Sequence, residues 1–458
     1  MTPLLFSTLT LNADMLANLE SLGYTEMTPI QAQSLPIILQ GHDIIAKAKT
    51  GSGKTAAFGI GLLAALDVKI FTTQALVLCP TRELADQVAK EIRRLARFTH
   101  NVKVLTLCGG VSIGPQIGSL ERGAHIVVGT PGRIVDHIEK GTLKLGTIKQ
   151  LVLDEADRML DMGFTDSIEA VLAACNSDRQ TLLFSATYPD GIKKISEHCQ
   201  KNPHEVSVES VHSDENIEQH FYELRETDRK DIAVQQLLAH FNPDSAIIFC
   251  NTKILCQDVC DLLRAQGVNA LALHGDLEQR DRDQVLVRFS NKSCSVLIAT
   301  DVAARGLDVK GLGAVINVEL AHDSEVHIHR IGRTGRAGES GLALSLVAHN
   351  DMSRLNRLAD YLQKSITLED LPKTQNPVNI KPEMVTLCMD GGKKEKIRPG
   401  DIIGALTKDA GLAFEKIGKI DIFEFASYIA VHHTIATQAL QHLQDGKIKG
   451  RKFRARKL

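Results

Sequence analysis

The stretch DIIAKAKTGSGKTAAFGIGLLAAL, residues 43–66, reads as a buried strand, a glycine-rich loop and a helix. In such a loop the backbone N–H groups point at phosphate oxygens, and the N-terminus of the following helix adds a favourable dipole. Lys54 is placed to reach the β- and γ-phosphates of a nucleotide, and the Thr55 hydroxyl to bind Mg²⁺. The general form of this loop has glycine where the chain has Ala48, so a simple glycine turn stays open here.

A second stretch, LVLDEADRML at residues 151–160, supplies the expected partner of this loop. Its apolar strand delivers Asp154 to the carboxyl end of a sheet, where open α/β sheets bind their ligands. Mg²⁺ is expected there, and Glu155 could polarise a water molecule for attack on the γ-phosphate. Acidic clusters are usually solvated surface, but these two residues follow directly on the apolar run. The two stretches together predict a nucleoside triphosphatase.

Short apolar runs alternate with amphipathic helical patterns through the first 350 residues, which predicts parallel sheets buried on both faces. A polar segment at 207–216 and three prolines within 371–382 indicate boundaries. We therefore expect an α/β protein in which two tandem RecA-like parallel-sheet domains precede a small α+β domain resembling an RNA recognition motif (RRM). The predicted domains are 1–208 and 217–370, then a linker at 371–382 and the small domain at 383–458.

Composition favours a cytoplasmic protein that does not enter a membrane. No apolar run approaches the roughly 20 residues that span a bilayer, and the start MTPLLFSTLTLN lacks the features of a secretory signal. The nine cysteines suit reduced thiols of the cytosol, and the spacing of Cys250, Cys256 and Cys260 fits no zinc pattern. We expect a monomer, because no additional apolar heptads are found.

The tetrapeptide DEAD at 154–157 is where the chain resembles a known family, the DEAD-box RNA helicases, over residues 1 to about 360. The family's phosphate loop has the form AxTGxGKT, which accounts for Ala48. The stretch GYTEMTPIQ at 23–31 resembles its Q motif, with an aromatic residue upstream. The resemblance implies that ATP is bound by Phe6, Gln31, Ala48, Lys49, Thr50, Gly51, Ser52, Gly53, Lys54, Thr55, Gly306 and Asp308.

The resemblance also implies how ATP is hydrolysed and how hydrolysis is coupled to strand separation. Mg²⁺ would be held by Thr55 and Asp154, partly through water. An arginine finger is worth roughly 10³–10⁵ in rate, and HRIGRTGR at 329–336 resembles the motif that supplies such fingers. The catalytic residues would be Lys54, Asp154, Glu155, Arg333 and Arg336, and the coupling residues Asp157, Ser185 and Thr187.

RNA is the substrate that the resemblance implies, because the family binds one strand through its phosphates and 2′-hydroxyls. The 2′-hydroxyl is also the physical means of rejecting DNA. ATP binding would bring the two domains together, and the bent strand could not stay in a short duplex. The RNA contacts implied for the helicase core are Thr81, Arg82, Gly110, Thr130, Arg133, Gln279, Arg282 and Thr300.

The last 75 residues or so read β–α–β–β–α–β, the order of an RRM. The aromatic signature expected on the third strand is missing, since this strand reads EFASYIAV and the first strand offers Cys388 and Met389. The chain ends in KIKGRKFRARKL, 447–458, with seven basic and no acidic residues. We therefore expect RNA contacts from the terminal strand and tail, at Lys447, Lys449, Arg451 and Lys452, although a basic edge strand that prevents aggregation is an alternative.

The resemblance extends through this terminal domain, and over the whole chain it is to a bacterial branch of the family that is specific for ribosomal RNA. It implies a helicase directed to a 23S ribosomal RNA hairpin of the peptidyl-transferase region, with precursors of the large (50S) subunit as partners. Two alternatives stay open: an ATP-gated RNA clamp that does not separate strands, and a DNA translocase of related fold. From residue 380 onward the chain has 15 basic and 9 acidic residues, whereas the whole chain has a net charge of −2. This separation of charge favours a terminal domain that binds nucleic acid.

Overall fold

The computed structural model describes residues 4–48, 51–188, 190–208, 217–304, 311–335, 341–374 and 376–458. The chain divides into two compact units, residues 1–211 and 212–458, which we take in turn. Within the described ranges no helix is long and apolar enough to cross a lipid bilayer.

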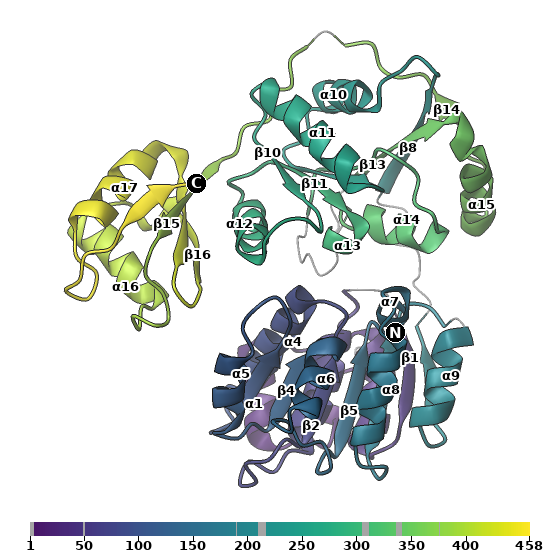
Figure 1. Cartoon of the computed structure of the whole chain (residues 1–458), viewed down its shortest axis with the longest axis vertical. Coiled ribbons are helices and arrows are strands. Elements are labelled where there is room, and N and C mark those ends of the chain that lie inside the picture. The colour runs from purple at the N-terminus through teal and green to yellow at the C-terminus, as the bar shows by residue number, and fades with distance from the viewer. Residues whose placement is uncertain are drawn as a thin grey trace. The chain divides into compact units, whose positions relative to one another are not determined.

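The first unit is a parallel sheet of seven strands in the order β3-β4-β2-β5-β6-β1-β7. Figure 1 labels its strands β4, β2, β5 and β1, with helices around them. Its strands are β1 (Ile44–Lys47), β2 (Ala75–Leu78), β3 (Val104–Leu107), β4 (Ile126–Gly129), β5 (Gln150–Asp154), β6 (Gln180–Ser185) and β7 (His204–Ser207). Its helices are the short 3₁₀ helix η1 (Phe6–Thr8), α1 (Ala13–Ser21), α2 (Pro29–Leu39), α3 (Lys54–Ala64), α4 (Arg82–Leu95), α5 (Gly114–Leu120), α6 (Pro131–Glu139), α7 (Ala156–Asp161), α8 (Thr165–Ala174) and α9 (Asp190–Cys199).

Continuous apolar strands form this sheet because both of its faces are covered. Alternate side chains of β5 enter different cores: Val152 packs in the cluster under α1 to α4, while Leu151 and Leu153 pack in the cluster under α6 to α9. The central strands β2, β4 and β5 therefore bury every residue, and their apolar runs show no alternation with polar residues. The parallel sheets of this unit and the next confirm the predicted fold class.

The second unit begins with another seven-stranded parallel sheet, in the order β10-β11-β9-β12-β13-β8-β14. Its strands are β8 (Ile217–Leu224), β9 (Ala246–Cys250), β10 (Ala270–Leu273), β11 (Val296–Thr300), β12 (Ala314–Asn317), β13 (Gly341–Ala348) and β14 (Leu368–Glu369). Its helices are α10 (Lys230–Phe241), α11 (Lys253–Ala265), α12 (Gln279–Ser290), α13 (Asp301–Ala304), α14 (Ser324–Ile331) and α15 (Met352–Leu362).

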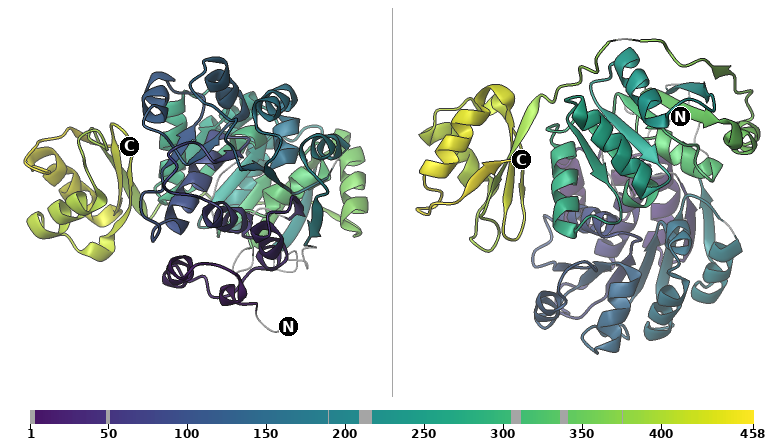
Figure 2. Two further views of the ribbon diagram at one scale, coloured as in Figure 1. Left: turned by 90° about the horizontal axis from the view of Figure 1, so that it is seen from below. Right: turned by 45° about the horizontal axis from the view of Figure 1, so that its top comes forward.

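The terminal module, residues 383–458, is an antiparallel sheet in the order β16-β17-β15-β18, with helices on one face (Figure 2). This is the predicted RRM-like arrangement. Its strands are β15 (Met384–Met389), β16 (Ile417–Ile422), β17 (Ser427–His432) and β18 (Ala455–Lys457). Its helices are α16 (Pro399–Gly404), which continues as a π-helical turn (Ala405–Asp409), and α17 (Ala436–Asp445).

The expectation of a terminal strand in the basic stretch that begins at Lys447 is wrong, because β18 begins only at Ala455. Lys449 and Gly450 both have positive φ angles, 50° and 75°. Two successive left-handed residues form a tight turn and cannot continue an extended strand. Ile448 and Arg451 pair across this turn. Most of the basic stretch is therefore a turn and a connecting segment.

Candidate active site

The loop between β1 and α3 has a backbone suited to hold phosphate. Gly51 and Gly53 have φ angles of 85° and 97°, in the region that favours glycine, and Gly53 caps α3. A Cβ atom on Gly53 would lie 2.5 Å from Nε2 of Gln31. Ser52 lies between the two glycines. The loop can therefore turn its amide groups inward without a side chain obstructing them.

The predicted Q motif meets the phosphate loop directly. Nε2 of Gln31 donates a hydrogen bond to the carbonyl oxygen of Gly53 at 3.1 Å, and its Oε1 accepts one from the Thr28 amide at 2.9 Å. Phe6 lies in η1, is buried, and packs edge-on against Tyr24 with ring centroids 6.0 Å apart. Contact of Phe6 with an adenine base stays a prediction.

Lys54, the first residue of α3, is buried at the mouth of this loop. Its Nζ donates a hydrogen bond to the carbonyl oxygen of Ala48 at 2.7 Å. Thr55 follows it on the same turn. Lys49 and Thr50 lie outside the described residues. The ammonium group thus lies beside the loop, where a bound phosphate could replace the carbonyl as its partner.

The acidic pair follows the buried strand β5 as predicted. Asp154 is 3 % exposed, and burial raises its pKa to about 7, against the opposing effect of the Lys54 charge. Glu155 has a φ angle of 53° and accepts a hydrogen bond from Nη1 of Arg158 at 3.0 Å. A buried carboxyl group such as that of Asp154, whose pKa is raised by burial, suits a hard cation such as Mg²⁺. The described residues contain no group of three or more His, Cys, Asp or Glu side chains that could hold a metal ion.

Asp157 joins the end of β5 to the segment after β6. Its Oδ2 accepts hydrogen bonds from the Ala186 amide at 3.1 Å, the Thr187 amide at 3.0 Å and the Thr187 hydroxyl at 3.1 Å. The Ser185 hydroxyl accepts one from the Asp157 amide at 3.3 Å. The three predicted coupling residues therefore form one network, through which a movement at either segment would reach the other.

Sheet order separates the predicted RNA contacts from the predicted ATP contacts. Thr81, Gly110 and Thr130 follow β2, β3 and β4, which are neighbours at one side of the sheet. The acidic pair follows β5, and the phosphate loop follows β1. Because parallel strands end at the same edge, the two predicted sites adjoin there: the RNA contacts follow β3, β4 and β2, and the ATP contacts begin at the neighbouring strand β5 and continue to β1.

Arg133 is held among the segments of this predicted RNA site. It donates to the carbonyl oxygen of Val111 at 2.9 Å and to Oε1 of Gln116 at 3.1 Å, and pairs with Asp136 at 3.1 Å. Arg82 lies 3.9 Å from Asp86. The loops after β3 and β4 are therefore joined by one side chain.

In the second unit Arg330 organises the carboxyl edge of the sheet. It is 2 % exposed and donates to both oxygens of Asp301, to Oδ1 of Asn251 at 2.7 Å and to the carbonyl oxygen of Glu319 at 2.8 Å. These partners follow β11, β9 and β12. Arg333, just beyond α14, is also buried. Gly306, Asp308 and Arg336 lie outside the described residues.

The remaining predicted RNA contacts lie on α12 and the end of β11. Nε2 of Gln279 donates to Oδ1 of Asp283 at 2.8 Å, and Arg282 donates to the carbonyl oxygen of Ala303 at 3.0 Å. Thr300 is the last residue of β11 and is partly exposed. Arg282 thereby attaches α12 to the segment that follows β11.

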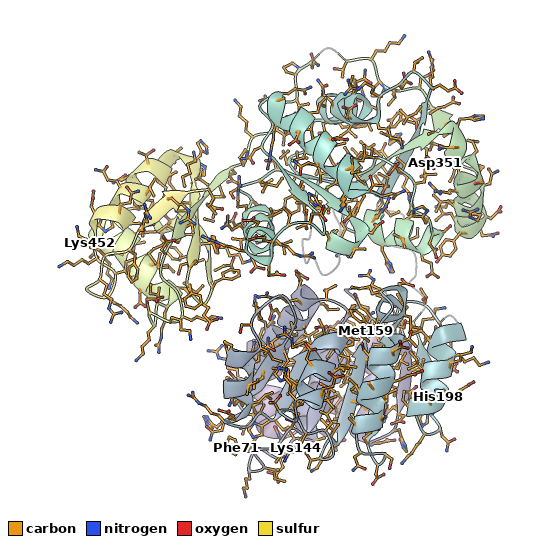
Figure 3. The ribbon with its side chains drawn as sticks, in the orientation of Figure 1. Phe71, Lys144, Met159, His198, Asp351 and Lys452 are labelled. Carbon is orange, nitrogen blue, oxygen red and sulfur yellow. The ribbon has the colours of Figure 1, made fainter. Side chains whose placement is uncertain are left out.

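The predicted contacts of the terminal module lie on and beside the turn after α17. Lys447, Arg451 and Lys452 are exposed, and Figure 3 labels Lys452 at the outer edge of the module. Nζ of Lys449 donates to the carbonyl oxygen of Lys396 at 2.7 Å and pairs with Asp401 at 3.1 Å. Lys449 therefore helps to hold the turn in place.

Sequence reasoning missed three residues that position the predicted ones: Arg158, Gln116 and Arg330. Arg158 and Arg330 both lie inside quoted motifs, one residue after Asp157 and three residues before Arg333, and only their burial distinguishes them. Gln116 carries no sequence signal that separates it from an ordinary surface glutamine.

Three family models match the chain in succession. They are described as DEAD/DEAH box helicase, over residues 28–195, helicase conserved C-terminal domain, over 229–338, and DbpA RNA binding domain, over 386–457. Each model matches part or all of one of the three sheet-containing domains described above.

Similar proteins extend along the whole chain. The ATP-dependent RNA helicase DbpA of Escherichia coli is 55 % identical over 454 residues, and that of Bacillus subtilis is 37 % identical over 475, each covering 99 % of both chains. The DEAD-box ATP-dependent RNA helicase CshA of Geobacillus kaustophilus is 44 % identical over 77 % of this chain and 75 % of its own. A solved structure of S. cerevisiae Dbp5 bound to RNA and ADP BeF3 has a TM-score of 0.71 and 30 % identity, covering 80 % of this chain and 95 % of that one.

Proposed function

The chain belongs to the DEAD-box ATP-dependent RNA helicases, and we propose that its terminal module directs this activity to 23S ribosomal RNA. The proposed target is a hairpin in the peptidyl-transferase region, and the proposed role is assembly of the large (50S) ribosomal subunit in the cytoplasm. The match to the DbpA RNA binding domain over 386–457 carries this proposal, together with similarity to DbpA along the full chain.

We propose that hydrolysis proceeds by positioning and charge stabilisation. Lys54 would move from the Ala48 carbonyl to the β- and γ-phosphates, and Glu155 would orient the attacking water. Mg²⁺ would be held by Thr55 and Asp154, partly through water, and would neutralise charge on the phosphate oxygens. Arg333 and Arg336, from the second domain, would supply further positive charge to the γ-phosphate.

We propose that the network around Asp157 couples hydrolysis to RNA. The acidic motif and the segment after β6 share the Asp157 carboxylate, so a shift of the phosphate site would be passed on toward the neighbouring RNA segments. The proposed RNA contacts of the core are Thr81, Arg82, Gly110, Thr130, Arg133, Gln279, Arg282 and Thr300.

ATPase measurements test the proposal. The full chain would be assayed without RNA, with poly(U), and with a 23S fragment that carries the peptidyl-transferase hairpin. We expect the fragment to stimulate far more than poly(U), and Glu155→Gln to abolish turnover. Equal stimulation by all RNAs would leave a general RNA helicase and reject the ribosomal assignment.

A pair of matched charge reversals localises the preference. Arg451→Glu with Lys452→Glu changes two adjacent exposed cations of the module, and Lys193→Glu with Lys194→Glu changes two adjacent exposed cations of α9. We expect only the first pair to weaken stimulation by the hairpin fragment, and more strongly at low salt, because phosphate contacts depend on counterion release.

A further inference from the structure

The open face of the terminal sheet is covered by the second helicase domain. Neighbouring residues of its strands face opposite ways: Leu387 and Ile429 pack against the module's own helices, whereas Cys388 and Tyr428 pack with Val287 of α12. Tyr428 is 4 % exposed. An RRM stacks bases on this face, so the one aromatic side chain that β17 offers here is not free to do so.

Buried hydrogen bonds hold this contact. The Thr386 hydroxyl of β15 accepts a hydrogen bond from Nδ2 of Asn291 at 2.8 Å and lies 2.5 Å from the Ser293 hydroxyl. The Met384 amide donates to the carbonyl oxygen of Lys292 at 3.4 Å. Bases that bind to the module must therefore find another surface.

An exposed aromatic side chain lies at the rim of the sheet instead. Phe425, in the connection between β16 and β17, is 67 % exposed, and Nζ of Lys394 lies 5.9 Å from the centre of its ring. Lys394 also pairs with Glu424 at 3.3 Å. Phe423, two residues earlier, packs toward the α12 contact. The ring of Phe425 thus presents its surface to solvent beside an ammonium group.

This rim is continuous with the basic tail. Lys393 and Lys394 donate their amides to the carbonyl oxygens of Phe423 and Glu424, at 2.9 and 3.0 Å, which joins the loop after β15 to that of Phe425. The loop after β15 also pairs with the tail. The bonds run from the Asp390 amide to the Arg454 carbonyl, at 2.8 Å, and from Lys449 Nζ to the Lys396 carbonyl, at 2.7 Å.

We propose that Phe425 stacks on an unpaired base of the bound RNA, while Lys393 and Lys394 contact the adjacent phosphates. A single exposed phenylalanine is common on protein surfaces and needs no function. Phe425 differs in its setting, because lysines flank it and the tail continues the positive charge, which complements an RNA backbone. Stacking between an aromatic ring and a base with cations on the flanking phosphates is how proteins hold single-stranded nucleic acid. The inference rests on the proposed binding of RNA by the module.

Phe414 provides a matched control for the experiment. It is 60 % exposed and lies in the same module, just before β16. The chain contains no tryptophan, so Phe425→Trp and Phe414→Trp each create a single indole reporter. Full chains would be titrated with three RNAs: the 23S hairpin fragment, an oligo(U) of equal length, and the blunt-ended duplex of the hairpin stem.

We expect RNA with unpaired bases to quench the fluorescence of Phe425→Trp and to leave that of Phe414→Trp unchanged. Phe425→Ala should bind the hairpin fragment about 5- to 150-fold more weakly, the loss expected for one stacked base. Phe414→Ala should bind as the unchanged chain does. The blunt duplex should bind all variants alike, because it offers no unpaired base.

Unchanged affinity of Phe425→Ala together with unquenched Phe425→Trp would overturn the inference. Equal losses for Phe425→Ala and Phe414→Ala would overturn it as well, since a general effect on the module would explain them. Failure of the proposed function looks different: the unchanged chain would then bind the hairpin fragment no better than oligo(U). The oligo(U) titration would still test the role of Phe425 in that case.

Discussion

The guanidinium of Arg330 donates a hydrogen bond to each oxygen of the Asp301 carboxylate, from Nε to Oδ1 at 2.7 Å and from Nη2 to Oδ2 at 2.6 Å. The same group reaches Asn251 after β9 and Glu319 after β12. Three strand ends and helix α14 are thus fixed by one side chain. Arg333, a predicted arginine finger, lies three residues further along the chain. We infer that Arg330 positions it.

Arg330→Lys tests this role. Lysine keeps the charge but lacks the planar fork that matches a carboxylate at two points. We expect the second domain to lose about 3 kcal/mol, the order of one buried hydrogen bond to a charged group, and RNA-stimulated ATPase activity to fall in parallel. Urea unfolding followed by circular dichroism measures the loss. Arg225→Lys, at an exposed ion pair with Asp370, is the control and should change little. Equal midpoints for the two variants would contradict the prediction.

The sheets could be predicted from the sequence because their physical signal is local. In β5, Leu151, Val152 and Leu153 are all buried, and a run without polar alternation indicates a strand covered on both faces. The acidic pair could be located in the same way, since chemistry lies at the carboxyl ends of such strands. The glycine-rich loop could be predicted as well, because Gly51 and Gly53 adopt φ angles that other residues rarely tolerate.

Other features depend on contacts that no local pattern encodes. Arginine usually lies at the surface, so burial of Arg330 follows only from where β9, β11 and β12 end together. The contact between Val287 and Tyr428 joins segments far apart in the chain, and neither residue differs in pattern from an ordinary core position. The turn at Lys449 could not be predicted, because basic and apolar residues alternate on both sides of it and this pattern is typical of a strand.

Gly53→Ala should damage the phosphate loop for two separable reasons. The φ angle of 97° is strained for alanine, and the new Cβ would lie 2.5 Å from Nε2 of Gln31. We expect ATP affinity to fall at least about tenfold, because the clash moves both the loop and the Q motif; strain of this kind alone costs about 1–2 kcal/mol. A fluorescent ATP analogue reports the affinity.

The control for this variant is Gly41→Ala. Gly41 has a φ angle of 84° in the same domain, but a Cβ atom there would meet no atom of the described residues within 4 Å. We expect it to lose some thermal stability and to keep its affinity for ATP. If both variants bind ATP equally well, the contact between Gln31 and the loop has no part in shaping the site.

Thr187→Val should weaken the coupling between hydrolysis and strand separation. The substitution keeps the size of the side chain and removes its hydrogen bond to Asp157, while the amide bonds from Ala186 and residue 187 remain. One hydrogen bond to a charged group contributes about 1.5–3 kcal/mol, so we expect unwinding per ATP to fall about tenfold or more. Thr187→Ser keeps the hydroxyl and should restore the ratio. Parallel loss of ATPase and unwinding in the valine variant would indicate a purely structural role.

His327 should make the second domain sensitive to acid. It is 2 % exposed and packs against Phe221 with ring centroids 6.0 Å apart, and within the described part of the chain neither ring nitrogen has a hydrogen-bond partner. Burial, followed by the nearby Arg330 charge, lowers its pKa from 6.5 to about 3. The folded chain therefore keeps this ring neutral over a range in which the unfolded chain protonates it.

The sign of the effect follows from proton binding. Below about pH 6.5 the unfolded state binds one more proton at this residue than the folded state, so stability falls with decreasing pH, by at most about 1.4 kcal/mol per pH unit, until the folded pKa near 3 is reached. Above about pH 8 the residue contributes almost no pH dependence, because the unfolded chain also keeps the ring neutral there. His327→Phe keeps an apolar ring in the same place and removes the titration. We expect its urea midpoint to fall less steeply than that of the unchanged chain between pH 7 and pH 5. Identical slopes would mean that the imidazole finds a proton acceptor or water when it is charged, and that its burial does not govern acid stability.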